Sequence, residues 1–222
     1  MLGYAISLAM HVTNAVHMAN TFKGDVLKDP DVKRFHDDQY KFLTVWNVYT
    51  QMFYAALGLS CDVLSLTNEG KVSLLLKTLK TIRDPLFSGV VLSCVFWTVF
   101  SYERSLILPP TVDKTLSWSA NHIIHTAIVT VVLWEIVFRP RNVPQSHLTN
   151  ICHSLYFIPV LLVNSYLTSD TWVYPIMNIL DGTTYLYLFF IVSVLLVQAF
   201  YCLQWYLTDL LWSSREDMKK NI

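Results

Sequence analysis

Long apolar runs constrain the fold of this chain more than any other feature. A helix that crosses a bilayer needs about 20 mainly apolar residues. Runs of roughly that length lie at about 2–22, 42–66, 85–102, 116–138, 147–167 and 183–207. Only 14% of the residues are charged, against about 25% in soluble domains, and the mean hydropathy is +0.41. The sequence therefore predicts an all-α, polytopic membrane helix bundle with six transmembrane helices, in one domain over residues 1–222.

The basic residues between the runs predict the orientation of the bundle. With six spans, both termini share one side of the membrane with the second and fourth loops. That side carries nine of the sixteen Lys and Arg residues, so the positive-inside rule favours cytoplasmic termini. The first run has no basic segment before it and no clear cleavage site after it, so we expect it to be retained. We predict a multi-pass protein of the plasma membrane or the endoplasmic reticulum.

Charge and cysteine content give no indication of nucleic-acid binding, a disulfide framework or a zinc site. Sixteen Lys and Arg balance sixteen Asp and Glu, which gives no indication of nucleic-acid binding. The four cysteines lie in four different apolar runs without a CxxC pair, which indicates neither a disulfide framework nor a zinc site. We expect no metal site, no cofactor and no obligate protein partner.

The second run carries a polar stripe. On a helical wheel of about 100° per residue, Asn47, Gln51 and Asp62 all lie within about 60° of Thr44. Polar groups are costly when they face lipid, so the stripe is expected to face the bundle interior or a wet cavity. Asn47 and Gln51 are interpreted either as hydrogen-bonding residues between helices or as donors to a reacting group.

The fourth run carries a second polar group. Trp118, Asn121 and His122 lie within about 60° of His125 on the same wheel, and Glu135 lies about 80° from it. Asn121 is placed to orient His125, four residues on. An ionisable residue within a span is a functional hypothesis by default, and two histidines with an asparagine strengthen it.

A threonine beside a histidine is the smallest arrangement of a nucleophile with its general base. The second and fourth spans run in the same direction, so Thr44 and His125 both lie in N-terminal halves. Their depths match if the second helix begins a few residues before Thr44, near His36 to Tyr40. The sequence permits this pair, and spacing alone does not establish it.

Several ordered motifs resemble one family. These are Lys41–Thr44 with Asn47, Gln51, Phe53–Tyr54 and Asp62–Leu64, then Asn121–Thr126 with Glu135 and Arg139–Pro140, and also Arg83–Asp84 and Thr171–Pro175. They are similar to motifs of the androgen-induced and androgen-dependent-TFPI-regulating membrane proteins. The resemblance implies a membrane threonine hydrolase that cleaves fatty acid esters of hydroxy fatty acids, with Thr44 as nucleophile and His125 as the essential histidine. The chain departs from the family pattern at Cys61-Asp62, where relatives often have two aspartates.

The leading hypothesis is thus an intramembrane ester hydrolase, whose partners are membrane lipids and a lipid substrate from the bilayer. Its oxyanion or substrate-binding candidates are Asn47, Gln51, Asn121, His122, Trp118 and Glu135. One alternative is a transporter or scaffold that uses the polar stripe, although no inverted repeat supports it. Another is a haem or metal protein ligated by histidines, the candidates being His11, His17, His122, His125 and His153.

Overall fold

The computed structural model describes residues 1–67, 76, 78–79, 87, 89–108, 110–139, 160, 162–168 and 170–220. The longer helices are α1 (Leu2–Thr21), α3 (Leu43–Thr67), α5 (Val90–Tyr102), α8 (Ala127–Phe138) and α11 (Thr184–Lys220). The shorter ones are η1 (Gly24–Lys28), α2 (Pro30–Asp37), η2 (Gln39–Lys41), η4 (Arg104–Leu106), α6 (Pro110–Thr115), α7 (Trp118–His125) and α10 (Pro175–Leu180). Residues 162–168 are also helical, and the described part of the chain contains no strand. The predicted all-α class is confirmed.

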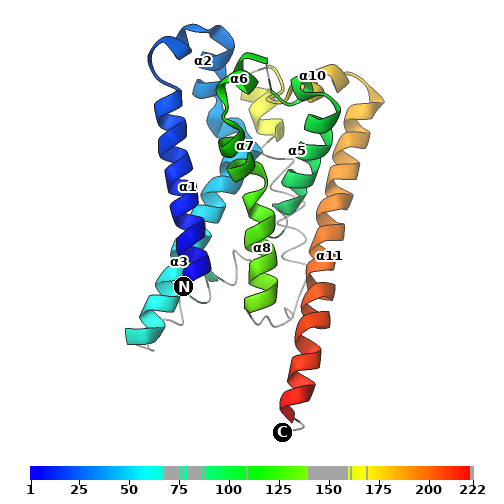
Figure 1. The fold of residues 1–222 in the computed structure, drawn as a ribbon. Coiled ribbons are helices and arrows are strands. Elements are labelled where there is room, and N and C mark those ends of the chain that lie inside the picture. Colours follow the sequence, from blue (N-terminus) through cyan, green and yellow to red (C-terminus); the bar gives the residue numbers. More distant parts are fainter. Residues whose placement is uncertain are drawn as a thin grey trace.

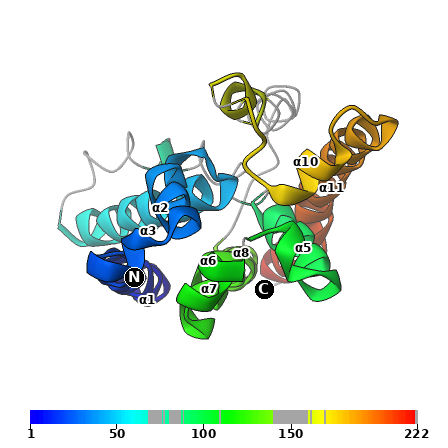
Figure 2. The same cartoon turned by 90° about the horizontal axis from the view of Figure 1, so that it is seen from above.

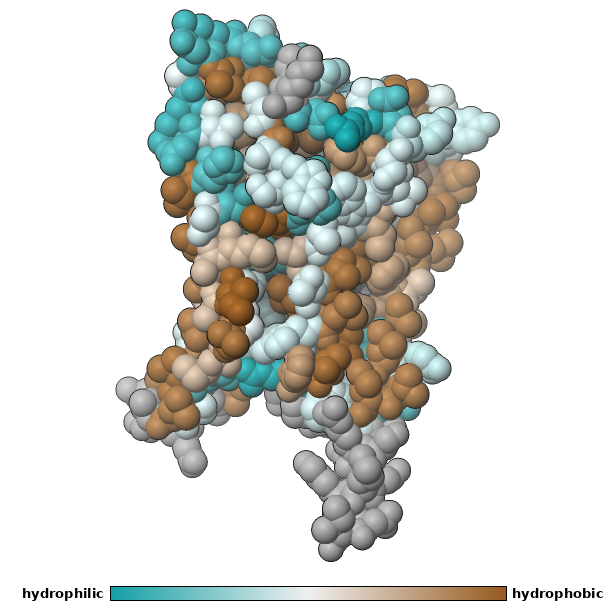
Figure 3. Space-filling model, in the orientation of Figure 1, coloured by the Kyte–Doolittle hydropathy of each residue, from teal (hydrophilic) through white to brown (hydrophobic). Residues whose placement is uncertain are grey.

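The helices form an elongated bundle (Figure 1). The N-terminus of α1 and the C-terminus of α11 lie toward one end of it, and α2, α6 and α10 gather at the other end. Seen from above, α1 and α3 form one side, α5 and α11 the other, and α7 with α8 lies between them (Figure 2). Residues at the end that carries α2 are mostly polar on the face shown in Figure 3, whereas the surface of α11 is mostly apolar.

Helices α1 and α3 correspond to the first two predicted spans within one residue. The buried residues of α1 are Tyr4, Ser7, His11 and Asn14, and their spacing of three or four places them on one helical face. Gly58 allows α3 to approach that face closely. A Cβ atom at Gly58 would lie 2.4 Å from Cζ of Tyr4, so any larger residue would push the helices apart.

The predicted fourth span is not one straight helix. It consists of α7 and α8, which are bent by 41° at a break beside Thr126. The Val129 N–H donates to the Thr126 carbonyl, three residues back, at 3.0 Å. Such a bond replaces the normal bond to the fourth residue back and tightens the helix locally. His125 is the last residue of α7, so the bend lies immediately after the predicted base.

The helix α11 indicates that the protein associates with a membrane. Its segment Thr184–Trp212 has a mean hydropathy of 2.3 in its most apolar part, and only 17% of that part is buried within the protein. A core helix of a soluble protein would be mostly buried. Among the described residues α11 alone has both the length and the apolarity of a span, and the bent pair α7–α8 is a second candidate. Six spans are therefore not confirmed.

The other predicted spans do not meet both requirements, length and apolarity, and the reasons differ. Helices α1 and α3 are long enough, but polar residues such as His11, Asn14 and Gln51 lower their hydropathy. Helix α5 is apolar but has 13 residues, which is about 20 Å of helix. Most of the fifth predicted span, and the second and fourth loops used for the charge count, lie outside the described residues.

Candidate active site

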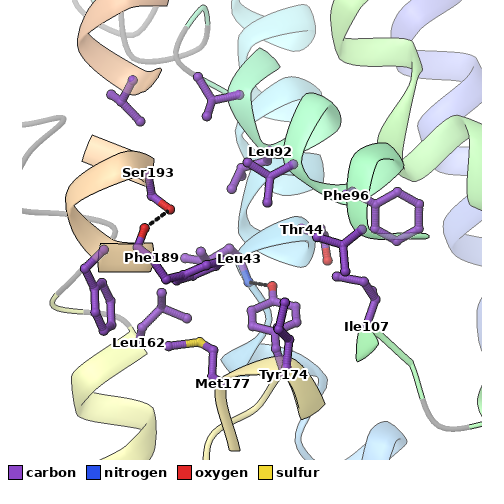
Figure 4. Close-up of a pocket in the computed structure, with 16 residues that line it drawn as sticks. Leu43, Thr44, Leu92, Phe96, Ile107, Leu162, Tyr174, Met177, Phe189 and Ser193 are labelled. Carbon is purple, nitrogen blue, oxygen red and sulfur yellow. Dashed lines mark hydrogen bonds between the residues drawn. The ribbon is translucent and has the colours of Figure 1, made fainter. Parts of the chain in front are cut away.

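Thr44 is the second residue of α3 and lines a cavity between α3, α5, α10 and α11 (Figure 4). The cavity holds about 730 Å³ of empty space, including its open mouth. Its lining consists of Leu43, Thr44, Val91, Leu92, Val95, Phe96, Val99, Ile107, Leu162, Tyr174, Ile176, Met177, Phe189, Phe190, Ser193 and Val197. Apart from Thr44, the polar side chains among these are Tyr174 and Ser193, and the Ser193 hydroxyl donates to the Phe189 carbonyl at 2.8 Å. We call this space the Thr44 cavity.

Tyr174 approaches Thr44 from the loop before α10. Its hydroxyl accepts a hydrogen bond from the Leu43 N–H at 3.0 Å, and hydrogen bonding with Thr44 lowers the pKa of the same phenol. Phe42, which precedes α3, has no side-chain oxygen to cap the helix. The Tyr174 hydroxyl instead satisfies the Leu43 N–H, one of the N–H groups that the start of a helix leaves without a partner in the helix.

The loop that carries Tyr174 is held by two hydrogen bonds of Asn178. The Trp172 N–H donates to Oδ1 of Asn178, and Nδ2 of Asn178 donates to the Trp172 carbonyl, both at 2.9 Å. The Tyr174 ring also packs edge-on against Phe42, with ring centroids 5.5 Å apart. Burial raises the pKa of Tyr174 to about 12, although its hydrogen bonds with Leu43 and Thr44 oppose that shift. The hydroxyl is thus protonated at neutral pH.

The structure places His125 directly behind one wall of the Thr44 cavity. The imidazole is buried and stacks on the Phe96 ring, with centroids 3.3 Å apart and an angle of 5° between the planes. Phe96 itself lines the cavity, so its ring stands between the cavity and His125. Within the described residues, His125 forms no hydrogen bond with Thr44.

The depth at which Thr44 and His125 lie explains this separation. Their predicted pairing required the second helix to begin near His36 to Tyr40. This condition is not met, because α2 ends at Asp37 and α3 begins at Leu43. Thr44 therefore lies in the first turn of α3, while His125 lies two turns into the bundle at the end of α7.

The polar stripe of α3 faces the bundle interior, as predicted. Asn47 and Gln51 are buried, and Gln51 pairs with His11 of α1 through Oε1 and Nε2 at 3.1 Å. We call the buried polar residues between these helices the α1–α3 seam; they are Ser7, His11, Asn14, Asn47 and Gln51. None of them lines the Thr44 cavity.

Several polar atoms in and beside the seam lack a partner among the described residues. They are Ser7 Oγ, His11 Nδ1, Gln51 Nε2 and, on α7, Asn121 Oδ1. Buried polar groups are normally paired with protein or with ordered water. The seam is therefore a polar environment within the bundle, in contrast to the cavity at the start of α3.

His122 and Trp118 do not lie in the Thr44 cavity. His122 Nδ1 is 3.0 Å from Thr126 Oγ1, and its ring packs between those of Trp97 and Trp118, with centroid distances of 4.7 and 4.2 Å. Trp97 Nε1 also donates to Thr126 Oγ1 at 3.0 Å. These contacts hold the bend between α7 and α8, so the structure gives His122 and Trp118 a packing role.

Glu135 lies in the last turn of α8, whereas Thr44 lies in the first turn of α3. It accepts a hydrogen bond from the Tyr4 hydroxyl, and Arg139 lies over the Tyr4 ring at 5.0 Å. Arg139 Nη2 also binds Oδ2 of Asp62 at 2.5 Å, and the N-terminal ammonium group binds the same carboxylate. This network joins α1, α3 and α8, and the proposed role of Glu135 at the oxyanion has no support in its position.

Metal coordination is not indicated by the described residues, since none of their His, Cys, Asp and Glu side chains form a group of three suited to hold an ion. His153, one of the predicted ligand candidates, lies outside that part of the chain.

Tyr174 was not identified as a site residue from the sequence. The signal available was its place in the Thr171–Pro175 motif. That motif gave no indication that the hydroxyl would reach the start of a helix 131 residues away.

Comparison with known proteins identifies the family. Residues 6–208 match the FAR-17a/AIG1-like protein family. The chain belongs to this family. It is 33% identical to the androgen-dependent TFPI-regulating protein of Mesocricetus auratus over 78% of this chain and 77% of that protein. It is 30% identical to the protein of that name from Rattus norvegicus over 95% of each chain. It is 27% identical to the androgen-induced gene 1 protein of Homo sapiens over 82% of this chain and 81% of that protein.

No solved structure matches the chain significantly. The arrangement of Thr44, Tyr174, Phe96 and His125 described above therefore comes from this structure alone. The predicted family resemblance is confirmed.

Proposed function

We propose that this FAR-17a/AIG1-like protein is an intramembrane hydrolase that cleaves the ester bond of fatty acid esters of hydroxy fatty acids. The observation that carries the proposal is a hydroxyl, that of Thr44, in the wall of a cavity that is apolar apart from Thr44, Tyr174 and Ser193. An apolar cavity suits an acyl chain. Its lining leaves a substrate ester little to bind except Thr44 and Tyr174.

In the proposed reaction, Thr44 is the nucleophile and His125 the general base. His125 takes the proton of the Thr44 hydroxyl as Oγ attacks the ester carbonyl carbon. The bond to the alkoxy oxygen then breaks, and that oxygen takes the proton from His125, which leaves the acyl group on Thr44. A water molecule next loses a proton to His125 and attacks the acyl carbon. The bond to Thr44 Oγ breaks, Oγ takes the proton, and the fatty acid departs.

This mechanism requires the Phe96 ring to leave the face of His125. It also requires His125 and Thr44 to approach each other, and an acyl chain that enters the cavity contacts the Phe96 ring. Catalytic geometry often tightens only when substrate binds. We propose that the bound ester displaces Phe96 and brings the imidazole into contact with Thr44.

The proposed topology is six passes with both termini in the cytoplasm, in the plasma membrane or the endoplasmic reticulum. Glycosylation-acceptor tags at each terminus test it. Neither tag should be modified, whereas modification of one tag alone would require an odd number of passes.

The decisive test of the activity is covalent labelling with a fluorophosphonate, followed by mass spectrometry of the modified peptide. The proposal expects one label on Thr44 of the purified protein, lost in Thr44→Ala, together with release of fatty acid from the ester substrate. Full hydrolysis by purified Thr44→Ala protein would exclude the mechanism.

A further inference from the structure

The contacts of Tyr174 point to a function at the oxygen of Thr44. Its hydroxyl is the polar group that the structure places against Thr44 within the described lining of the cavity. Figure 4 shows the phenol directed at the first turn of α3, where it meets the Leu43 N–H. Ser193, the other lining residue with a hydroxyl, is bound to its own helix.

A count of donors and acceptors decides what the Tyr174 hydroxyl can do. A phenolic oxygen has two lone pairs and one hydrogen. The Leu43 N–H occupies one lone pair at 3.0 Å, which leaves the other lone pair and the hydrogen for Thr44. Once Thr44 Oγ has lost its proton it can only accept a hydrogen bond, so the phenolic hydrogen is the part of Tyr174 that can bind it.

We propose that Tyr174 is a further catalytic residue, whose hydroxyl donates a hydrogen bond to Thr44 Oγ and stabilises the negative charge that forms there. This proposal rests on the proposed function. The charge develops on Oγ twice, once when Thr44 is deprotonated and again when the acyl bond to it breaks. Tyr174 therefore assists both halves of the reaction.

The surroundings of Thr44 strengthen such a bond. Thr44 lies in the first turn of a 25-residue helix, where the helix dipole favours negative charge. The rest of the cavity wall is apolar, so little water competes with the donor, and preorganised donors act most strongly in dry sites. The Asn178 hydrogen bonds fix the loop, which keeps the phenol in place before substrate arrives.

The test compares the rates at which a fluorophosphonate labels Thr44 in the full-length protein and in Tyr174→Phe. This substitution removes one oxygen atom and keeps the ring against Phe42. We expect the second-order rate constant to fall about 100-fold, as is typical when one such donor is lost. The final extent of labelling should stay at one group per protein, because the nucleophile remains present in every molecule.

Tyr166→Phe is the matched control. The Tyr166 ring stacks on Trp172 of the same loop, with centroids 4.5 Å apart, but it does not line the Thr44 cavity. We expect this variant to be labelled at the wild-type rate. That result would show that loss of a phenolic oxygen near the loop is not enough to slow the reaction.

Two results would overturn the role of Tyr174. One is a Tyr174→Phe rate constant within twofold of wild type. The other is an unchanged rate constant with a reduced final extent of labelling, because this would mean that Tyr174 only caps α3 and that some molecules lose their structure. If the wild-type protein is not labelled on Thr44 at all, the proposed function itself is wrong, because Thr44 is then not a reactive nucleophile.

Discussion

Helix α3 borders two regions of opposite character. Its first turn faces the Thr44 cavity, where the side chains are apolar apart from Thr44, Tyr174 and Ser193. Its second and third turns face the α1–α3 seam, where the buried residues are polar and several of their atoms lack a partner within the described chain. A single polar stripe thus borders two environments, of which the first is an open cavity with a mostly apolar wall.

The difference shows that burial of a polar residue in this bundle does not by itself indicate a catalytic role. Gln51 is fully buried and hydrogen-bonded to His11. This bond joins α3 to α1, which is a structural role. Thr44 is less buried, but it lies beside open space and a second hydroxyl. His125 lies between the two regions, since it is buried in the bundle and contacts the cavity only through Phe96.

The strongest test of this contrast is removal of the two proposed reacting groups. Thr44→Ala and His125→Ala should each lower hydrolysis by at least about 1,000-fold, because a nucleophile and its base act as a unit and losing either costs about as much as losing both. Thr44→Ser keeps the hydroxyl, so part of the activity should survive. Turnover of a fatty acid ester by the purified proteins measures this, and equal activity in all variants would place the chemistry outside the cavity.

The Phe96 ring packs on His125 and also lines the Thr44 cavity. Phe96→Leu shortens the side chain that separates His125 from the cavity, so we expect fluorophosphonate labelling of Thr44 to become several-fold faster. The same change removes the stacked ring, and loss of buried aromatic contacts should lower the melting temperature. Slower labelling alongside the lower melting temperature would mean that Phe96 supports the site instead of shielding it.

The seam should respond to mutation in stability more than in activity. Gln51→Leu leaves Nε2 of the buried His11 without its partner, which typically costs about 1–3 kcal/mol of stability. Hydrolysis per folded molecule should remain within about threefold of wild type. Thr50→Val is the control on the same helix, because the Thr50 hydroxyl binds only the Trp46 carbonyl of its own helix. An activity loss for Gln51→Leu that matches Thr44→Ala would instead assign Gln51 to the oxyanion.

The smallest expected effect concerns alkaline pH. Burial raises the pKa of Tyr174 to about 12, against about 10 for an unfolded tyrosine. The folded state therefore holds this proton more tightly, and its contribution to stability is complete below about pH 10 and is lost as the pH rises toward 12. The melting temperature of wild type should fall more steeply over that interval than that of Tyr174→Phe. Parallel curves would mean that Tyr174 ionises freely in the folded protein.

Much of the helical framework was predictable from sequence. The bounds of α1 and α3 and the inward direction of the Asn47–Gln51 stripe follow from apolar length and helical periodicity, both of which are properties of neighbouring residues. The family was recognisable from motifs around Thr44 and His125 for the same reason. Periodicity also placed Trp118 and His122 on the same side of their helix as His125, without showing what that side contacts.

The contents of the site were decided by tertiary structure. Tyr174 meets the start of α3 although Leu43 and Tyr174 are 131 residues apart, and the Phe96 ring covers His125 from another helix. The bend after His125 and the start of α3 at Leu43 set the relative depth of His125 and Thr44. Periodicity gives the direction of a side chain from its own helix axis, but which side chains meet depends on how the helices pack, and packing is a property of the whole bundle.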